Sequence, residues 1–203
     1  MSLNASHKTF EGSMNTREAI LTRRTVQKFS TDPVPEGCVE RAVECALRAP
    51  NHKLTNPWRF RRAGPETREK LLNIVLDIKR ADAAAKGREL KQQSIDMIQA
   101  KAGNSPELLV VTQIRNDEDA FRSREDYAAI ACAIQNISLS LWSEGVGSKW
   151  ATGGPTRHPD TYKLLGIDPA SEEIVGFVRI GHPMVEPMES PRLPLKDVYS
   201  ELP

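Results

Sequence analysis

The segment from Arg124 to Glu144 constrains the fold more than any other part of the chain. Its pattern predicts one long helix with small and apolar residues around much of its circumference. These residues are Ala128, Ala129, Ala131, Ala133, Ile134, Ile137, Leu139 and Leu141. A helix that is apolar on several sides is covered by other elements on those sides. We therefore expect other elements to cover this helix on several sides.

Short strand patterns alternate with helical patterns along the rest of the chain. Strands are expected at 58–63, at 108–112, where a continuous apolar run indicates burial, and at 149–152 and 174–180. Helices are expected at 16–24 after a capping box at Asn15, and at 35–49, 65–102 with a break near Gly87, and 159–165. Because the strands are few, these patterns predict an α+β fold in which helices surround one central mixed β-sheet.

Length and charge fit a single globular domain. The chain has 203 residues, and 28 Lys and Arg against 27 Asp and Glu leave a formal net charge of +1. This balance gives no reason to expect nucleic acid as a partner, and no apolar stretch of about 18 residues predicts a membrane span. We expect a flexible segment at 1–14 and one domain at 15–203. The proline-rich end at 183–203 is expected to be disordered or to form an arm over a neighbouring subunit.

The cysteines Cys38, Cys45 and Cys132 are expected to be buried free thiols of a cytoplasmic protein. Cys38 and Cys45 would lie about 10 Å apart on one helix, which is too far for a disulfide. The histidines at 7, 52, 158 and 182 lack the spacing of zinc ligands, so no metal is expected. The acidic pairs at 125–126 and 172–173 are interpreted as solvated charges.

Cationic side chains stand where two helical patterns end. Arg23 and Arg24 end the first pattern, and Arg48 and His52 follow the second. Helix ends and the loops beside them are suited to holding polar ligands, and arginine forks match phosphate geometry. The residues therefore predict a phosphorylated ligand. In the alternative interpretation, the paired arginines only complement the C-terminus of a helix.

The chain resembles the nitroreductase family of FMN-dependent oxidoreductases. The motifs that carry the resemblance are Arg-Arg-Thr at 23–25, Arg-Ala-Pro-Asn-His at 48–52, Pro-Trp-Arg-Phe at 57–60, Trp-Ala-Thr-Gly-Gly at 150–154, and the segment at 173–183. The second motif is similar to that of a small bacterial subgroup with Arg-Ala-Pro-Asp/Asn-His. The resemblance covers most of residues 16–194. It implies a nitroreductase-like α+β fold and an intertwined homodimer with FMN at the interface.

The same resemblance implies which residues bind FMN. They are Arg23, Arg24, Thr25, Arg48, His52, Trp150, Ala151, Thr152, Gly153 and Arg192. Arg23 and Arg24 would extend from the ring edge to the phosphate, and Arg48 and His52 would lie near the ring. No catalytic side chain is implied, because hydride transfer takes place at the flavin N5. The chain departs from the family at Gln27, where a basic residue is frequent, and at Leu54, where larger relatives have Asn.

The implied activity is that of an enzyme that transfers hydride from NADH or NADPH through FMN to an electron-poor acceptor. Nitroaromatics and quinones are acceptors of this kind. One alternative is a flavin enzyme that does not use nicotinamide, in an oxygen-driven or dehalogenating reaction. Another is a non-catalytic flavin-binding module. The sequence does not identify the physiological acceptor.

Overall fold

A computed structural model describes residues 14–203 of the chain. The predicted flexible segment at 1–14 lies outside the described residues except for Met14. The helices are α1 (Thr16–Thr22), α2 (Cys38–Ala46), α3 (Pro65–Ala84), α4 (Gln92–Ile98), α5 (Ala120–Ser143) and α6 (Pro159–Leu165). The strands are β1 (Trp58–Arg62), β2 (Glu107–Ile114), β3 (Gly147–Ala151) and β4 (Glu172–Gly181). Each strand and helix expected from the sequence is present, with shifted ends.

The strands form one sheet in the order β1-β2-β4-β3, and every neighbouring pair is antiparallel. The expected mixed sheet is therefore wrong, although the α+β class is right. Alternating strands and helices suggested neighbouring parallel strands, but the connection through α5 joins β2 to β3, and the antiparallel strand β4 lies between these two strands in the sheet. A parallel contact occurs as an isolated bridge between Thr25 and Ser148 of β3.

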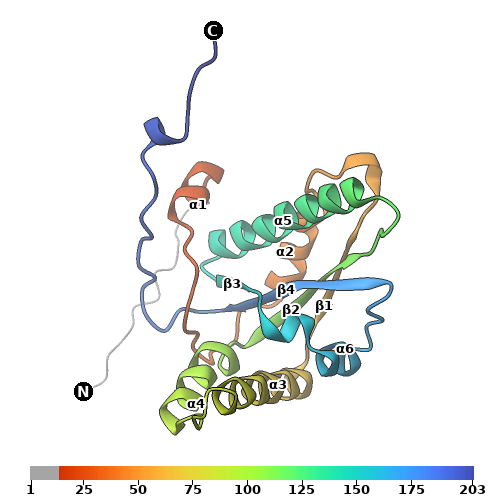
Figure 1. Cartoon of the computed structure of the whole chain (residues 1–203). Helices are drawn as coiled ribbons and strands as arrows, with labels where there is room; N and C mark the ends of the chain where they lie inside the picture. The colour runs from red at the N-terminus through yellow and green to blue at the C-terminus, as the bar shows by residue number, and fades with distance from the viewer. Residues whose placement is uncertain (1–13) are drawn as a thin grey trace, which may run out of the picture.

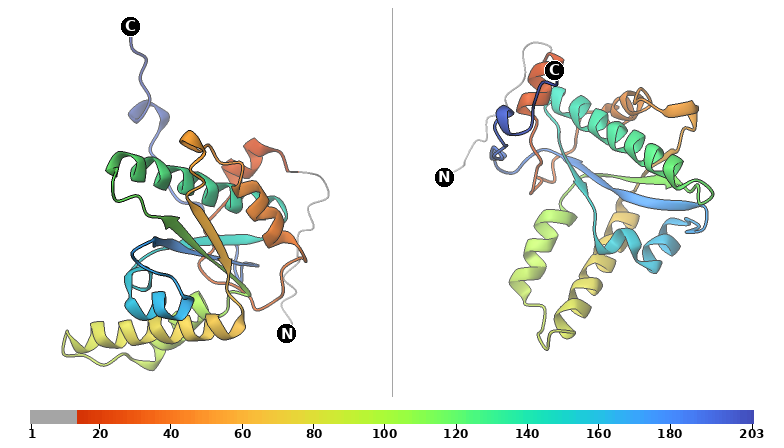
Figure 2. Two further views of the ribbon diagram at one scale, coloured as in Figure 1. Left: turned by 90° about the vertical axis from the view of Figure 1, so that its right-hand side faces the viewer. Right: turned by 45° about the horizontal axis from the view of Figure 1, so that its top comes forward.

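Helices cover both faces of the sheet (Figure 1). The helices α2 and α5 lie on one face, and α3 and α6 lie on the other, as the turned views also show (Figure 2). Leu109 and Val111 of β2 belong to the first core cluster, whereas Leu108 and Val110 belong to the second. Because side chains alternate along a strand, a strand with helices on both faces is apolar throughout. This is why 108–112 could be recognised as a buried strand.

Local signals explain where the helices begin and end. The Asn15 side chain accepts a hydrogen bond from the Glu18 N–H at 2.9 Å, which is the expected cap of α1. The expected break in 65–102 is confirmed, since α3 ends at Ala84 and α4 begins at Gln92, with Gly87 at a φ of 65° between them. None of the residues of α4 is buried, so this helix lies at the surface as expected.

The helix α5 is covered on only part of its circumference in the single chain. Ile130, Ile134 and Ile137 are at most 2% exposed and face the sheet core. Ala128 and Cys132 are exposed on the outer side. Coverage on several sides, as the sequence predicts, is therefore not provided by this chain alone.

The expected burial of all cysteines is wrong for two of them. Cys38 is buried, whereas Cys45 and Cys132 are exposed, and all of them are free thiols. Cys45 lies on the exposed side of α2. Burial raises the pKa of the Cys38 thiol above its usual value.

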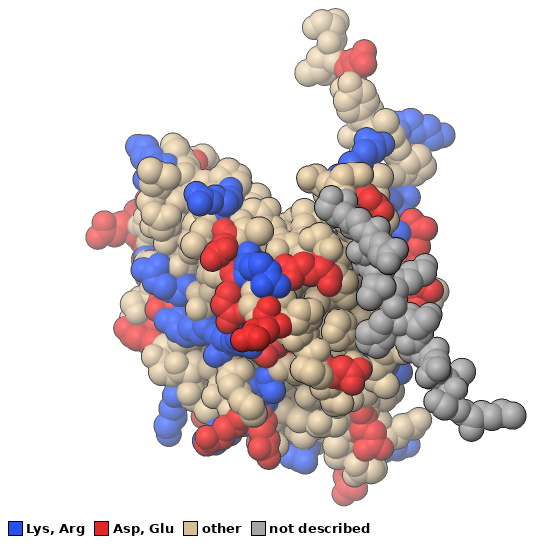
Figure 3. Space-filling view, turned by 180° about the vertical axis from the view of Figure 1, so that it is seen from behind, with Lys and Arg blue, Asp and Glu red and all other residues tan. Residues whose placement is uncertain are grey.

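The C-terminal residues 183–203 extend away from the body of the molecule, past α1 (Figure 1). They hold a short 3-10 turn at Leu195–Asp197 and expose several apolar side chains, namely Met188, Leu193, Leu195, Val198 and Leu202. On the face seen from behind, basic and acidic side chains intermingle (Figure 3). Within residues 14–203, no helix is long and apolar enough to cross a membrane.

Candidate functional site

Arg23, Arg24 and Arg192 lie together beside the C-terminal end of α1, and we call them the arginine group. Arg23 is the C-cap of α1 and is partly buried. The Arg24 Nη1 donates to the Leu21 carbonyl at 2.7 Å, and its Nη2 lies 3.2 Å from Glu189 Oε1. Arg24 therefore complements the helix end, as the alternative interpretation predicted, and also binds the C-terminal arm.

Arg23 is the least satisfied cation of the arginine group. Its Nε atom is buried and has no hydrogen-bond partner among residues 14–203. Burial lowers the pKa of the Arg23 guanidinium, and repulsion from Arg192 and Arg24 lowers it further. A buried donor without a partner carries a desolvation cost that a bound anion would remove. The arginine group is therefore chemically suited to a phosphate.

The residues that follow Arg24 lie beside the edge strand β3. Thr25 forms the parallel bridge with Ser148, and the Val26 N–H donates to the Ser148 carbonyl at 3.1 Å. Trp150 and Ala151 belong to β3, and the predicted site residues Thr152 and Gly153 follow directly. One surface thus joins the segments 23–25 and 150–153, which are far apart in the sequence.

The end of β3 is shaped by two glycines. A side chain at Gly176 would place its Cβ 2.3 Å from the Trp150 Nε1, so the Trp150 indole packs over β4 only because Gly176 has no side chain. Gly153 has a φ of 129°, a conformation that favours glycine, and a Cβ there would meet nothing within 4 Å. The backbone after Thr152 is therefore open to close approach by a ligand.

His52 belongs to a second cluster, the histidine group, which consists of His52, Glu125 and Arg122. The His52 Nδ1 lies 2.8 Å from Glu125 Oε1, and Arg122 Nη1 lies 3.0 Å from Glu125 Oε2. The geometry of the second contact does not meet hydrogen-bond criteria, so we regard it as an ion pair. Every charged side chain of this group has a partner of opposite sign.

The loop that carries His52 is held in an unusual conformation. Lys53, Leu54 and Asn56 have φ values of 54°, 53° and 47°, which L-residues other than Asn and Asp rarely adopt. The Asn51 side chain fixes the loop, because it accepts from the Asn56 N–H at 2.8 Å and donates to Thr55 Oγ1 at 2.9 Å. Strain of this kind is frequent at functional sites.

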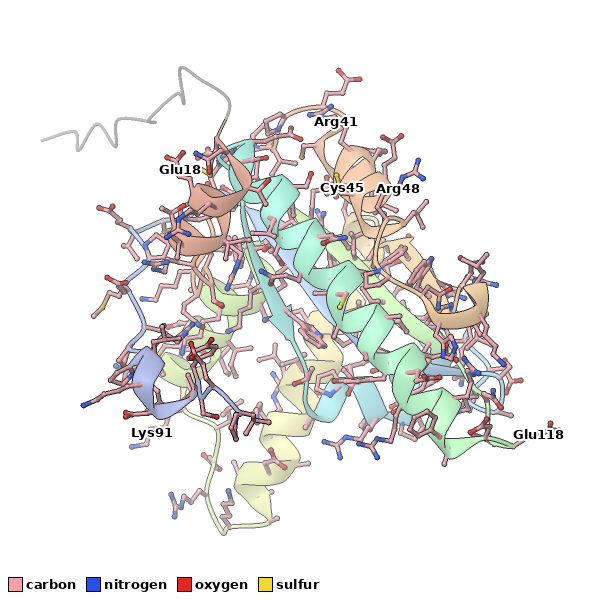
Figure 4. The ribbon with its side chains drawn as sticks, turned by 90° about the horizontal axis from the view of Figure 1, so that it is seen from above. Glu18, Arg41, Cys45, Arg48, Lys91 and Glu118 are labelled. Carbon is pink, nitrogen blue, oxygen red and sulfur yellow. The ribbon has the colours of Figure 1, made fainter. Side chains whose placement is uncertain are left out.

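Arg48 is exposed just beyond α2, and its side chain forms no hydrogen bond or ion pair within residues 14–203. It lies across α5 from Glu18 and α1 (Figure 4). Trp58, a few residues further along the chain, is 6% exposed and belongs to the core. Arg48 and His52 are therefore separate from the arginine group within one chain.

The two groups lie at opposite ends of α5. His52 contacts Glu125 near the start of the helix, whereas Thr22, next to Arg23, accepts from Trp142 Nε1 near its end at 3.0 Å. A helix rises about 1.5 Å per residue, so these contacts are about 25 Å apart. A site that used both groups would need two copies of the chain.

The interpretation of the acidic pairs as solvated charges is wrong for three of the residues. Glu125 binds His52, and Asp126 is 4% exposed and accepts from Thr55 Oγ1 at 2.5 Å. Glu172 accepts from Arg61 at 2.8 Å, and this bond lowers the pKa of the Glu172 carboxyl. These partners are distant in the sequence, so no local pattern reveals them. Glu173 is exposed, as expected.

A cavity of about 720 Å³ lies elsewhere, between the 31–37 loop and the ends of β1 and β2. Its lining includes Arg62, which is bonded to Glu40 and Glu107 at 2.7 Å each. Because the Arg62 charge is already neutralised, this cavity has less to offer an anion than the arginine group has. None of the predicted site residues lines it.

The family model for the nitroreductase family matches residues 20–182 of the chain. The chain belongs to the nitroreductase family. The match includes the segments 23–25, 48–52 and 150–154, on which the sequence resemblance rests.

Individual relatives agree with this assignment. The Bacillus subtilis protein YfhC, provisionally named an NAD(P)H nitroreductase, is 27% identical, over 92% of this chain and 93% of its own length. The crystal structure of a nitroreductase-like family protein from Bacillus cereus has a TM-score of 0.76 and 26% identity, with 92% of this chain and 95% of that chain covered. A provisionally named nitroreductase from Desulfovibrio desulfuricans, solved in complex with FMN, shares the fold with a TM-score of 0.69 and 21% identity, over 92% of this chain and 96% of that chain.

Proposed function

We propose that this chain is an FMN-dependent oxidoreductase that takes hydride from NADH or NADPH. It would pass the reducing equivalents to an electron-poor acceptor such as a nitroaromatic or a quinone. The observation that carries the proposal is the buried, unpartnered Arg23 Nε beside Arg192 and Arg24, which fits a phosphate-bearing cofactor. The name of YfhC, an NAD(P)H nitroreductase by provisional assignment, supports the nicotinamide co-substrate.

We infer that the working form is a homodimer with FMN at the interface. The arginine group of one protomer would hold the phosphate, and Arg48 and His52 of the other would lie near the ring. Two features of the single chain support this arrangement. The outer side of α5 exposes Ala128 and Cys132, and the 183–203 arm extends away from its own body with exposed apolar side chains. The domain at 15–203 would therefore be complete only as a pair.

When bound, FMN supplies the chemistry, because its N5 position accepts and delivers the hydride. The chain's own part is to bind and orient. The backbone at Thr152 and Gly153 would lie close to the ring, since Gly153 leaves that approach open. Glu125 would hold the His52 imidazole in one orientation through the 2.8 Å contact at Nδ1, which leaves Nε2 free to face the ring.

The visible absorption spectrum of the purified protein tests the flavin directly. We expect a yellow protein, or a colourless one that becomes yellow with equimolar FMN and stays so after gel filtration. Anaerobic addition of NADPH or NADH should then bleach the flavin, and a nitroaromatic or quinone should restore the colour. A protein that takes up no FMN contradicts the proposal.

The same experiment separates the alternatives. Bound FMN that neither nicotinamide bleaches would favour a flavin enzyme that does not use nicotinamide. Bound FMN that is bleached but returns electrons to no acceptor would favour a non-catalytic flavin-binding module. Both results would leave the FMN site in place and overturn only the activity.

A further inference from the structure

Lys149 lies in the middle of β3, between the candidate FMN segments 23–25 and 150–153. Its Nζ donates to Gln27 Oε1 at 2.6 Å, across 122 positions of sequence. The bridge between Thr25 and Ser148 sets this contact, because it aligns the residues after Thr25 with those after Ser148. The Gln27 carboxamide thereby fixes the position of a cation on the surface that joins the two segments.

Other cations surround Lys149, and no carboxylate within residues 14–203 forms an ion pair with it. Arg179 of β4 is directly opposite Lys149 in the antiparallel register. The Arg179 Nη1 donates to the Lys101 carbonyl at 3.4 Å, which brings the Lys101 residue to the same place. Like charges opposite each other in a sheet are destabilising. The arrangement is therefore unfavourable by itself and becomes favourable when an anion approaches.

The environment of Lys149 changes the pKa of its ammonium group. Burial lowers the pKa of the Lys149 ammonium, and repulsion from Arg179 and Lys101 lowers it further. Arg179 itself is partly buried, and burial lowers the pKa of its guanidinium. A negative charge beside Lys149 would counteract the lowering of both pKa values.

We propose that Lys149, held by Gln27, is the cation that faces the pyrimidine edge of the flavin ring. The inference rests on the proposed function and adds a residue to it. Reduction of a flavin leaves negative charge at N1 and the neighbouring carbonyl, and a positive charge there sets the reduction potential. Gln27 itself is uncharged, so the charge comes from the adjacent strand instead.

The test compares Lys149→Gln and Lys149→Arg with the wild-type protein, each loaded with FMN. The readouts are the midpoint potential of the bound flavin and its dissociation constant for sulfite. Sulfite adds to the flavin N5 and leaves a negative charge on the pyrimidine side. Lys149→Gln should shift the potential to a more negative value and weaken sulfite binding by about tenfold or more, as expected for the loss of one charge-assisted contact. Lys149→Arg keeps the charge and should remain near wild type.

Lys28→Gln is the matched control, because Lys28 is an exposed lysine next to Gln27. It removes the same charge and should change neither readout. Gln27→Leu is a second variant at an exposed position, and it should give a smaller change in the direction of Lys149→Gln. Unchanged potential and sulfite affinity in both Lys149→Gln and Gln27→Leu overturn the inference. A wild-type protein that takes up no FMN overturns the proposed function as well, so the two failures are distinguishable.

Discussion

The two ends of α5 differ in how their charges are satisfied. At the histidine end, His52, Glu125 and Arg122 form a chain of contacts at 2.8 and 3.0 Å. At the arginine end, Arg23 has a buried Nε without a partner among residues 14–203, and its neighbours include two further arginines. The Glu125 carboxylate at the histidine end has a cationic partner on each oxygen, whereas Arg23 at the arginine end has no ion pair among residues 14–203, although its neighbour Arg24 pairs with Glu189.

This difference suggests separate roles for the two ends. A network of paired charges holds its side chains in fixed positions and contributes to stability. A cation without a partner contributes little to stability, but it gains a charge-assisted bond of about 1.5–3 kcal/mol when an anion binds. Substitutions at the arginine end should therefore affect FMN binding without affecting the fold, whereas those at the buried contacts of the histidine end should affect stability as well.

The largest effect is expected for Arg23→Ala. The substitution removes the donor with no protein partner, so it should raise the dissociation constant for FMN by about 10- to 100-fold. The unfolding free energy should stay within about 0.5 kcal/mol of wild type, because no bond within the described chain is lost. Fluorescence titration with FMN and urea unfolding measure the two quantities.

Arg17→Ala is the control for this prediction, since Arg17 is an exposed arginine on the same helix α1. It should retain FMN like the wild type. If the Arg23→Ala protein kept full flavin occupancy after extensive dialysis, Arg23 would not contribute to FMN binding, and the two ends would not differ in this respect.

The opposite pattern is expected for Asp126→Ala at the histidine end. Asp126 is 4% exposed and accepts from Thr55 Oγ1, beside the loop that carries His52. The loss of this buried acceptor should cost about 1–3 kcal/mol of unfolding free energy. Asp117→Ala, at an exposed position, should change stability by no more than about 0.5 kcal/mol. An Asp126→Ala protein as stable as wild type would show that the contacts at this end do not stabilise the fold.

A smaller effect is expected for Arg192→Ala. Arg192 is exposed, and its Nη1 donates only to the carbonyls of Ser190 and Pro191 at 3.3 and 3.0 Å. Exposed charge pairs contribute about 0.2–1 kcal/mol, so FMN affinity should fall by up to about fivefold. A loss of FMN affinity as large as that of Arg23→Ala would show that Arg192 of the C-terminal arm contributes as much to phosphate binding as Arg23 does.

Local sequence patterns were sufficient to predict where the helices and strands lie along the chain. Asn15 and Glu18 mark the start of α1, and the apolar run at 108–112 identifies β2 because both faces of that strand are buried. Strand direction depends on how distant segments meet, and for that reason the mixed sheet was predicted wrongly. The predicted coverage of α5 on several sides is provided only in part by this chain, because Ala128 and Cys132 lie on the side of the helix that the chain leaves open.

The candidate site was predictable only in part, for the same reason. Motif resemblance pointed to Arg23 and His52, but their partners cannot be inferred from neighbouring residues. Glu125 is 73 positions from His52, and Lys149 is 122 positions from Gln27. Both were missed because a lone Glu on a helix or Lys in a strand carries no local signal. Only the packing of α5 and β3 brings these side chains to their partners.

The central claim is that each FMN is held by the arginine group of one protomer and by Arg48 and His52 of another. Differently tagged Arg23→Ala and Arg48→Ala/His52→Ala chains would be co-expressed, and the mixed dimer purified through both tags. If sites are shared between protomers, one site carries all the substitutions and the other none. The mixed dimer should then bind about one FMN per dimer, whereas each parent dimer loses its flavin. A mixed dimer that retains no FMN, like its parents, would contradict the claim, because it would place every site within a single chain.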